Sequence, residues 1–247
     1  MNPDLLYPFA LSLAAGLSTA AGGIIVFFIK NRESSGILGF ALGFSAGVMT
    51  VVSFGDLMPE AVGMLSSGFG IFAAAAAAAA MIAGVVLSFF IESKIPLNQE
   101  NQLGRVGLIS MLALITHNLP EGMATYLSAY KDLSLGVSVS LAIALHNLPE
   151  GIAIAVPIYY SSASRARAIG YSLLSGLSEP AGAVLAALAL RPFLTDTVLG
   201  LLFGLISGIM LCLSFRDLLP AAQGYGGMKT SLFGLFAGFI IMGIGIY

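Results

Sequence analysis

The amino-acid sequence is dominated by eight apolar segments, each long enough to cross a lipid bilayer. A helix that crosses the hydrocarbon core needs about 20 mainly apolar residues. The segments that meet this condition cover residues 5–29, 37–58, 69–91, 106–128, 134–159, 168–190, 197–219 and 230–247. We therefore predict an all-α integral membrane protein with eight transmembrane helices.

The composition excludes several classes of soluble protein. Only 9% of the residues are charged and 58% are hydrophobic, and the mean hydropathy is +0.98. A soluble enzyme or DNA-binding module would lack the polar surface that covers such a core. The net charge of −2 and the lack of a basic stripe argue against a nucleic-acid partner. The single cysteine, Cys212, excludes a disulfide framework and a thiolate metal site within one chain.

Basic residues are distributed unevenly among the predicted connections. The odd-numbered connections hold eight Lys and Arg residues, and the even-numbered connections hold two. Because cytoplasmic loops are enriched in Lys and Arg, we expect both termini to lie outside. The connections are short, the longest being around 92–105, so we expect one transmembrane domain over residues 1–247 with no soluble domain.

The outer spans contain an internal repeat. Gly47-Val48-Met49 and residues 53–59 (SFGDLMP) in the second span match residues 208–210 and 214–220 (SFRDLLP) in the seventh, 161 positions later. The first and sixth spans match at an offset of 160, and the third and eighth match more weakly at 164. Five spans separate the two copies, so they run in opposite directions, which is typical of transporters.

This repeat predicts a 3+2+3 arrangement of the spans. The halves 1–91 and 168–247 flank a central helix pair over residues 106–159, and spans 4 and 5 form a further inverted pair. The alternative is a duplicated structural membrane protein without a transport role. The charged residues at the centre of the repeat favour transport.

A six-residue word occurs in both central spans. His117-Asn118-Leu119-Pro120-Glu121-Gly122 lies in the middle of span 4, and residues 146–151 repeat it as HNLPEG in span 5. An ionisable group at this depth costs about 3 kcal/mol and is usually functional. Glu179 adds a third carboxylate near the middle of span 6.

The spacing within this word suits a metal site. On a helix, with His117 at 0°, Asn118 lies at about 100° and Glu121 at about 40°. Glu121 can therefore serve one site shared with His117 and another shared with Asn118. His146, Asn147 and Glu150 have the same spacing in span 5. This arrangement predicts a two-metal site in which Glu121 and Glu150 act as bridges.

The mixture of ligand types indicates a divalent transition metal. Imidazole with carboxylate and amide oxygens suits Zn²⁺, and also Fe²⁺, Mn²⁺, Co²⁺ or Cd²⁺. Ca²⁺ and Mg²⁺ prefer sites made of oxygen alone. A structural network of buried ion pairs is the alternative, and the excess of negative charge at this depth disfavours it. The metal is expected as transported substrate, with no resident cofactor required.

With its eight spans, outside termini and paired HN-x-PEG words, the whole chain resembles the ZIP family of divalent-metal transporters, in particular its bacterial ZupT-like branch. The resemblance implies movement of Zn²⁺ and related ions towards the cytoplasm through a binuclear centre. It further implies a bacterial inner-membrane location, with the lipid bilayer and divalent ions as partners and a homodimer as a candidate assembly. Many relatives carry a histidine-rich loop between spans 3 and 4, whereas residues 92–105 contain no histidine.

The resemblance also implies which residues form each metal site. The ligands of the first site are His117, Glu121, His146 and Glu150. The ligands of the second site are Asn118, Glu121, Asn147, Glu150 and Glu179.

The repeat suggests a path to and from the centre. Asp56 and Glu60 are expected near the outer end of the second span, and Asp217 near the inner end of the seventh. Under this hypothesis Asp56 and Glu60 help to recruit cations outside and Asp217 helps to release them inside. The alternative is that all three are solvated charges at helix ends.

Three functions are compatible with this set of residues. A carrier for divalent transition metals that works by alternating access is the leading hypothesis, and a selective metal channel is a close variant. An intramembrane metalloenzyme would use the same ligands around an activated water. The HExxH word of many metalloproteases is absent, and the available polar groups are already used as ligands, so we predict that the protein is not an enzyme.

Overall fold

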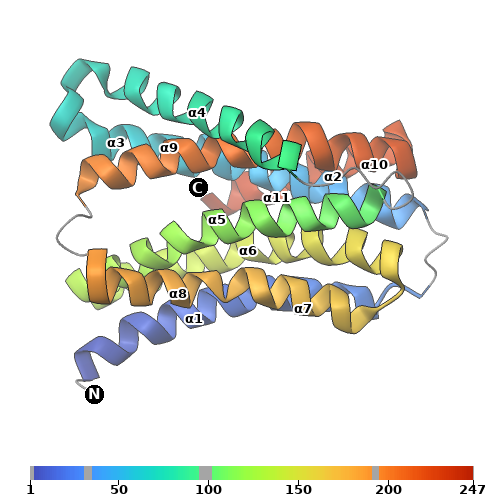
Figure 1. Cartoon of the computed structure of the whole chain (residues 1–247), viewed down its shortest axis with the longest axis horizontal. Helices are drawn as coiled ribbons and strands as arrows, with labels where there is room; N and C mark the ends of the chain where they lie inside the picture. Colours follow the sequence, from blue (N-terminus) through green and yellow to red (C-terminus); the bar gives the residue numbers. More distant parts are fainter. Residues whose placement is uncertain (1–2, 31–34, 95–101, 191–194, 247) are drawn as a thin grey trace.

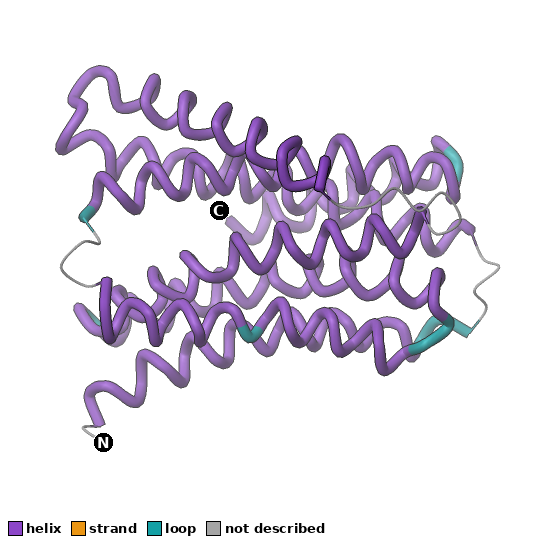
Figure 2. Tube along the Cα trace, in the orientation of Figure 1, coloured by secondary structure: helices purple, strands orange, loops and turns teal. Residues whose placement is uncertain are grey.

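The chain is helical almost throughout. The computed structural model describes residues 3–30, 35–94, 102–190 and 195–246, and within these ranges it contains no strand (Figure 2). The first part comprises α1 (Pro3–Gly23), the 3-10 helix η1 (Ile24–Phe27), α2 (Ser35–Val52), the π-helix η2 (Ser53–Leu57), α3 (Met58–Phe69), the 3-10 helix η3 (Gly70–Phe72) and α4 (Ala73–Lys94). The remainder comprises α5 (Gln102–Lys131), α6 (Leu133–Ser162), α7 (Arg165–Gly176), α8 (Ser178–Leu185), the π-helix η5 (Ala186–Leu190), α9 (Asp196–Cys212), the π-helix η6 (Leu213–Leu218), α10 (Leu219–Gly226) and α11 (Met228–Ile246).

The expectation of an all-α membrane protein is confirmed. Among the described residues, four helical stretches are long and apolar enough to cross a membrane, and they cover residues 6–27, 35–90, 136–162 and 196–226. The count of eight spans, their 3+2+3 arrangement and the single domain stay predictions. Arg32, Arg191, the two chain ends and residues 95–101 of the longest connection lie outside the described residues.

The predicted end of the second span is the boundary that differs most from the structure. The prediction stops at residue 58, but α2, η2 and α3 form one continuous helical path that ends at Phe69. Residues 59–69 contain Pro59, Glu60 and several Gly and Ser residues, so their hydropathy falls although they remain helical. Pro59 lies just after the π-helix η2, where the regular pattern of α-helical hydrogen bonds is interrupted. The helix ends at Gly70, whose φ of 52° suits glycine.

The matching words of the predicted repeat adopt the same unusual backbone conformation. Residues 53–57 form the π-helix η2, and residues 213–218 form the π-helix η6. Ser53 Oγ donates to the Met49 carbonyl and Ser214 Oγ donates to the Met210 carbonyl, each at 2.8 Å. A π-bulge changes the direction of the side chains that follow it and often occurs at functional sites. Each of the two π-helices contains an aspartate, Asp56 in η2 and Asp217 in η6.

The helices pack in two groups (Figure 1). The first group contains α1, α5, α6, α7 and α8, and the second contains α2, α3, α4, α9, α10 and α11. Glycines bring the backbones close together inside each group: a Cβ on Gly151 would lie 1.9 Å from the Thr19 oxygen, and one on Gly208 would lie 1.9 Å from the Met81 oxygen. Small residues allow such approaches in membrane helices.

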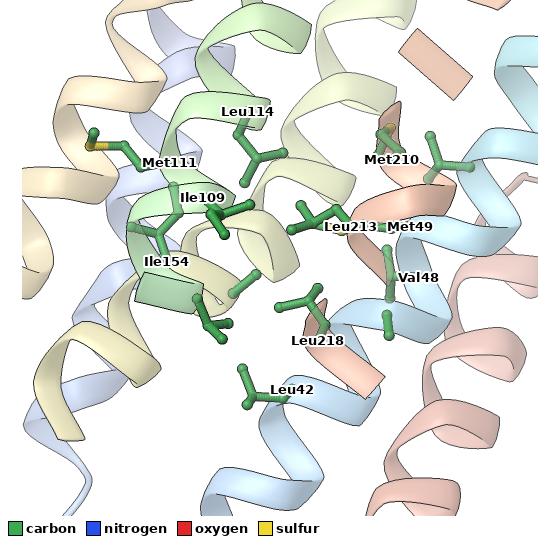
Figure 3. Packing of buried hydrophobic residues seen from close by; sticks show 14 of the residues in the cluster. Leu42, Val48, Met49, Ile109, Met111, Leu114, Ile154, Met210, Leu213 and Leu218 are labelled. Carbon is green, nitrogen blue, oxygen red and sulfur yellow. The ribbon is translucent and has the colours of Figure 1, made fainter. Parts of the chain in front are cut away.

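Large aliphatic side chains fill the space between the two groups at one end of the molecule. Leu42 of α2, Leu114 of α5 and Ile154 of α6 are each fully buried, and Leu218 of η6 is buried with them (Figure 3). These residues lie on the side of the central words that holds the beginnings of α2 and α5 and the end of α6. Buried aliphatic side chains therefore pack beside the central words on this side.

Candidate metal centre

The two repeated words come together on neighbouring helices. α5 carries His117 and Glu121 one helical turn apart, and α6 carries His146 and Glu150 with the same spacing. The i, i+4 spacing places both members of each pair on one helix face. All four side chains are buried, with exposed fractions of 3% or less. The helical register predicted from the sequence therefore brings these four residues to one buried site.

Glu121 lies between the two histidines. Its Oε1 is 3.1 Å from His117 Nε2 and 2.8 Å from His146 Nε2. Glu150 approaches the same centre, because its Oε1 is 3.2 Å from His117 Nε2. The sequence spacing predicted contact between Glu121 and the ligands on its own helix. The contact with His146 across the helix pair depends on how α5 and α6 pack.

These atoms have the spacing of metal ligands. Ligand atoms of His117, Glu121 and His146 all lie within 4.8 Å of one another. Two ligands bound at about 2.0–2.1 Å to a tetrahedral Zn²⁺ are about 3.3 Å apart. The observed nitrogen–oxygen distances of 2.8–3.2 Å need only small adjustments to reach this value. The group can therefore hold a divalent ion without a change of fold.

A second buried polar group adjoins the first. Asn147 Nδ2 donates to Glu179 Oε1 and, at 3.0 Å, to the Ala15 carbonyl. With its amide oxygen and nitrogen interchanged, Asn118 donates to Glu150 Oε2 at 3.2 Å. In the other orientation the amide oxygen faces Glu150, where it could bind a metal ion. Glu150 thus contacts both groups, His117 through Oε1 and Asn118 through Oε2.

The family of the chain follows from comparison with known proteins. The sequence profile of the family described as ZIP Zinc transporter matches residues 97–245, a range that includes both repeated words. The chain belongs to the ZIP family. It is 39% identical over 265 residues to "Zinc transporter ZupT" of Chlorobium chlorochromatii (strain CaD3), covering 100% of this chain and 98% of the relative.

Two further relatives carry the same name. "Zinc transporter ZupT" of Akkermansia muciniphila is 40% identical over 261 residues, covering 97% of this chain and 96% of the relative. "Zinc transporter ZupT" of Oceanobacillus iheyensis is 40% identical over 263 residues, covering 98% of each chain. The resemblance to the ZupT-like branch is therefore confirmed over the full length. ZIP proteins are transporters, and this sets the metalloenzyme alternative aside.

Several polar atoms of this ZIP centre are buried and have no hydrogen-bond partner. They include Glu121 Oε2, Glu179 Oε2, Asn147 Oδ1, His146 Nδ1 and His117 Nδ1. An unpaired buried polar atom costs about 1–3 kcal/mol, and a charged one costs more. Those of Glu121, Glu179 and Asn147 are oxygen atoms that can bind a cation. The donor set therefore fits a divalent metal ion as the substrate.

Close packing of α5 on α8 holds the second group together. A Cβ on Gly122 would lie 1.9 Å from the Glu179 carbonyl oxygen, and one on Gly182 would lie 1.9 Å from the Leu119 carbonyl oxygen. Only glycine permits this approach of the two backbones. The glycine that ends the repeated word thus places Glu179 beside the helix that carries Glu121.

Two of the three predicted path residues line a cavity that reaches the centre. A cavity of about 320 Å³ is lined by Asp56 and Glu60 at one part and by Glu121 at another, with Phe203 of α9 in its wall. Asp217 is buried on η6 and lines neither this cavity nor the neighbouring one. The structure therefore joins Asp56 and Glu60 to the centre and leaves the role of Asp217 a prediction.

The sequence reasoning missed one residue at the mouth of this path. Asp196 lines a second cavity of about 540 Å³ together with Asp56 and Glu60. It lies 136 positions beyond Glu60 in the chain, so only the folded packing of α9 against α3 brings them together. The available signal was its position in one of the predicted outer connections, where few residues are charged.

Proposed function

We propose that this chain carries divalent transition-metal ions, with Zn²⁺ as the leading substrate, across a membrane into the cytoplasm. Fe²⁺, Mn²⁺, Co²⁺ and Cd²⁺ are further candidate substrates. The observation that carries this proposal is the convergence of His117, Glu121 and His146 at a buried point between α5 and α6, two helices of 30 residues each. Family membership and the name of its relatives, zinc transporter, agree with it.

The charges of the site favour a doubly charged ion. Glu121, Glu150 and Glu179 together supply three negative charges when ionised, and all are buried. A divalent cation offsets most of this charge, whereas burial of unpaired carboxylates is unfavourable. Neutral imidazole nitrogens add ligands that Zn²⁺ prefers over Mg²⁺ or Ca²⁺. The donor set thus explains both affinity and choice of metal.

Two metal sites fit the arrangement of side chains. The first uses His117, Glu121, His146 and Glu150. The second uses Asn118, Asn147 and Glu179 together with the same two bridging glutamates. The unpaired Asn147 Oδ1 and Glu179 Oε2 support the second site, because both are ligand atoms.

The cavity that reaches the centre from one end, with aliphatic packing on the other side of the centre, supports alternating access. The cavity lined by Asp56, Glu60 and Glu121 reaches the centre from one end. At the other end Leu42, Leu114 and Ile154 are fully buried (Figure 3). A carrier exposes its site to one side at a time, whereas an open channel exposes it to both. In the predicted orientation, the cavity faces outside and the aliphatic packing faces the cytoplasm.

The proposal also includes a location and an orientation in the membrane. The predicted arrangement is a multi-pass protein of a bacterial inner membrane, with eight spans in a 3+2+3 order and both termini outside. In this orientation Asp56 and Glu60 meet incoming ions, and Asp217 helps to release them into the cytoplasm. A homodimer is the candidate assembly.

Uptake into proteoliposomes tests the proposal. Wild type should accumulate Zn²⁺ in a saturable manner, and a panel of Zn²⁺, Fe²⁺, Mn²⁺, Co²⁺, Cd²⁺ and Mg²⁺ ranks the substrates. Glu121→Gln keeps the shape of the side chain but removes its charge, and His146→Ala removes a ligand nitrogen. Both should abolish uptake while the protein elutes and melts as a folded protein.

The control and the channel alternative need separate measurements. Asp132→Asn changes an exposed carboxylate between α5 and α6 and should leave uptake unchanged. Full uptake by Glu121→Gln would refute the assigned site. Counterflow separates the two modes of transport: internal Zn²⁺ accelerates uptake of labelled Zn²⁺ through a carrier, and a channel shows no such acceleration.

A further inference from the structure

Two neighbouring cavities lead from the surface to the metal centre. The first, of about 540 Å³, is lined by Asp56, Glu60 and Asp196 along with Met64 and three small or apolar residues. The second, of about 320 Å³, shares Asp56, Glu60 and Met64 with the first and continues to Glu121. The shared residues show that the two cavities adjoin. An ion at the outer cavity therefore has a route to the centre.

The four carboxylates of this route become progressively more buried. Asp196 and Glu60 are exposed, Asp56 is half-buried and Glu121 is 3% exposed. Glu121 Oε2 is one of the unpaired buried oxygens, and Glu121 lines the inner cavity. A cation that follows this route exchanges water for protein oxygens gradually. The desolvation cost is thus spread over several positions.

The position of Asp196 at the start of α9 gives it a structural role in stabilising that helix. It lies in the first turn of α9, where a negative charge stabilises a helix by about 0.3–1 kcal/mol. The capping hydrogen bond of this helix, however, comes from Thr195, whose side chain accepts from the Val198 N–H at 3.3 Å. Asp196 is therefore not required as the capping side chain. Asp196 also lies in the wall of the outer cavity, beside Asp56 and Glu60.

We propose that Asp196, together with Asp56 and Glu60, forms an outer vestibule that gathers a hydrated divalent cation and passes it to Glu121. This inference rests on the proposed transport function. The acidic groups of the vestibule offer only oxygen atoms, and the cavity is wide enough for an ion that keeps its water. The vestibule therefore attracts Mg²⁺ as well as Zn²⁺, and the selection of zinc takes place at the histidines.

Kinetics with the Asp196→Asn variant test this inference. A unit charge about 7 Å from a hydrated divalent ion, screened at physiological salt, changes the local ion concentration about twofold to threefold. Initial Zn²⁺ uptake by proteoliposomes with the vestibule facing outwards should therefore show a KM two to three times that of wild type and an unchanged Vmax. Asp196→Glu should restore the wild-type KM.

Two further measurements separate this role from stabilisation of α9. The KM difference between wild type and Asp196→Asn should disappear at about 1 M KCl, where the Debye length falls to about 3 Å. Millimolar Mg²⁺ should raise the KM of wild type more than that of the variant. A change in thermal stability alone would alter neither measurement. Asp132→Asn, which removes a charge outside both cavities, should behave as wild type.

The outcomes distinguish the two proposals. A wild-type KM for Asp196→Asn, with zinc uptake by wild type intact, would overturn the vestibule and leave the transport function standing. A higher KM that persists at high salt would also overturn it, because an electrostatic effect must be screened. Failure of the wild-type protein to take up any divalent metal would instead refute the proposed function.

Discussion

Adding a single methyl group at Gly122 should separate α5 from α8 and damage the proposed second metal site. A Cβ at this position would lie 1.9 Å from the Glu179 carbonyl oxygen and 2.5 Å from its carbonyl carbon. Real Cβ atoms essentially never approach closer than 3.0 Å. The backbones must therefore move apart by about 1.1 Å, the difference between 3.0 and 1.9 Å. Both partners at this contact are helix backbone, so a side-chain rotation cannot relieve it.

A shift of this size is large for a metal site. Ligand distances are kept within about 0.2 Å in well-formed sites, and Glu179 is the residue that the methyl group would push. Overpacking of this kind costs about 1–3 kcal/mol of stability. We therefore expect Gly122→Ala to bind one zinc ion in place of two, and to transport zinc at least about tenfold more slowly, because a misplacement of about 1 Å can cost about a hundredfold in rate.

Metal stoichiometry and uptake measured on the same preparation test this expectation. Zinc bound per chain is determined by elemental analysis after desalting, and initial uptake is measured in proteoliposomes. Gly170→Ala on α7 is the matched control, because a Cβ there meets nothing within 4 Å. If Gly122→Ala binds two zinc ions and transports at the wild-type rate, the close contact of α5 and α8 is not what positions Glu179.

Two other substitutions test separate contacts. Ser45→Ala removes the buried hydrogen bond that Ser45 Oγ donates to the Pro149 carbonyl at 2.8 Å, which joins α2 to the word on α6. A loss of about 1 kcal/mol should lower Tm by about 2–4 °C, and Ser45→Thr, which keeps the donor, should lower it less; equal melting of Ser45→Ala and wild type would contradict this. Glu179→Gln removes a ligand charge of the second site only, so it should reduce bound zinc from two ions to one while His117 and His146 still hold the other. Two ions bound by Glu179→Gln would argue against the assignment of Glu179.

The sequence predicted the components of the centre better than their contacts. The i, i+4 spacing of the repeated word placed His117 and Glu121 on one face because a helix has 3.6 residues per turn. It could not show that Glu121 would lie closer to His146 than to His117, at 2.8 Å against 3.1 Å. That contact depends on how α5 and α6 pack, which includes the close approach of Gly107 on α5 to Ile154 and Ile158 on α6.

Hydropathy located the helices but not the irregularities within them. It ended the second span at residue 58, although the helix continues to Phe69, because polar residues remain helical where they line an aqueous cavity. It also gave no sign of the π-helices η2 and η6. The serine in each SFxDL word was the available clue, since a serine that hydrogen-bonds to the carbonyl four residues earlier often bends a helix.

The predicted repeat and the observed structure together bear on the mode of transport. An offset of 161 relates Leu42 of α2 to Phe203 of α9. Phe203, which is 7% exposed, lines the cavity that reaches Glu121, whereas Leu42 is fully buried and lines neither described cavity. These two positions of the predicted repeat therefore differ in their access to the cavity. The difference agrees with the proposed carrier, because the two halves of a carrier exchange environments when its site turns from one side of the membrane to the other. The counterflow measurement decides between this carrier and a channel.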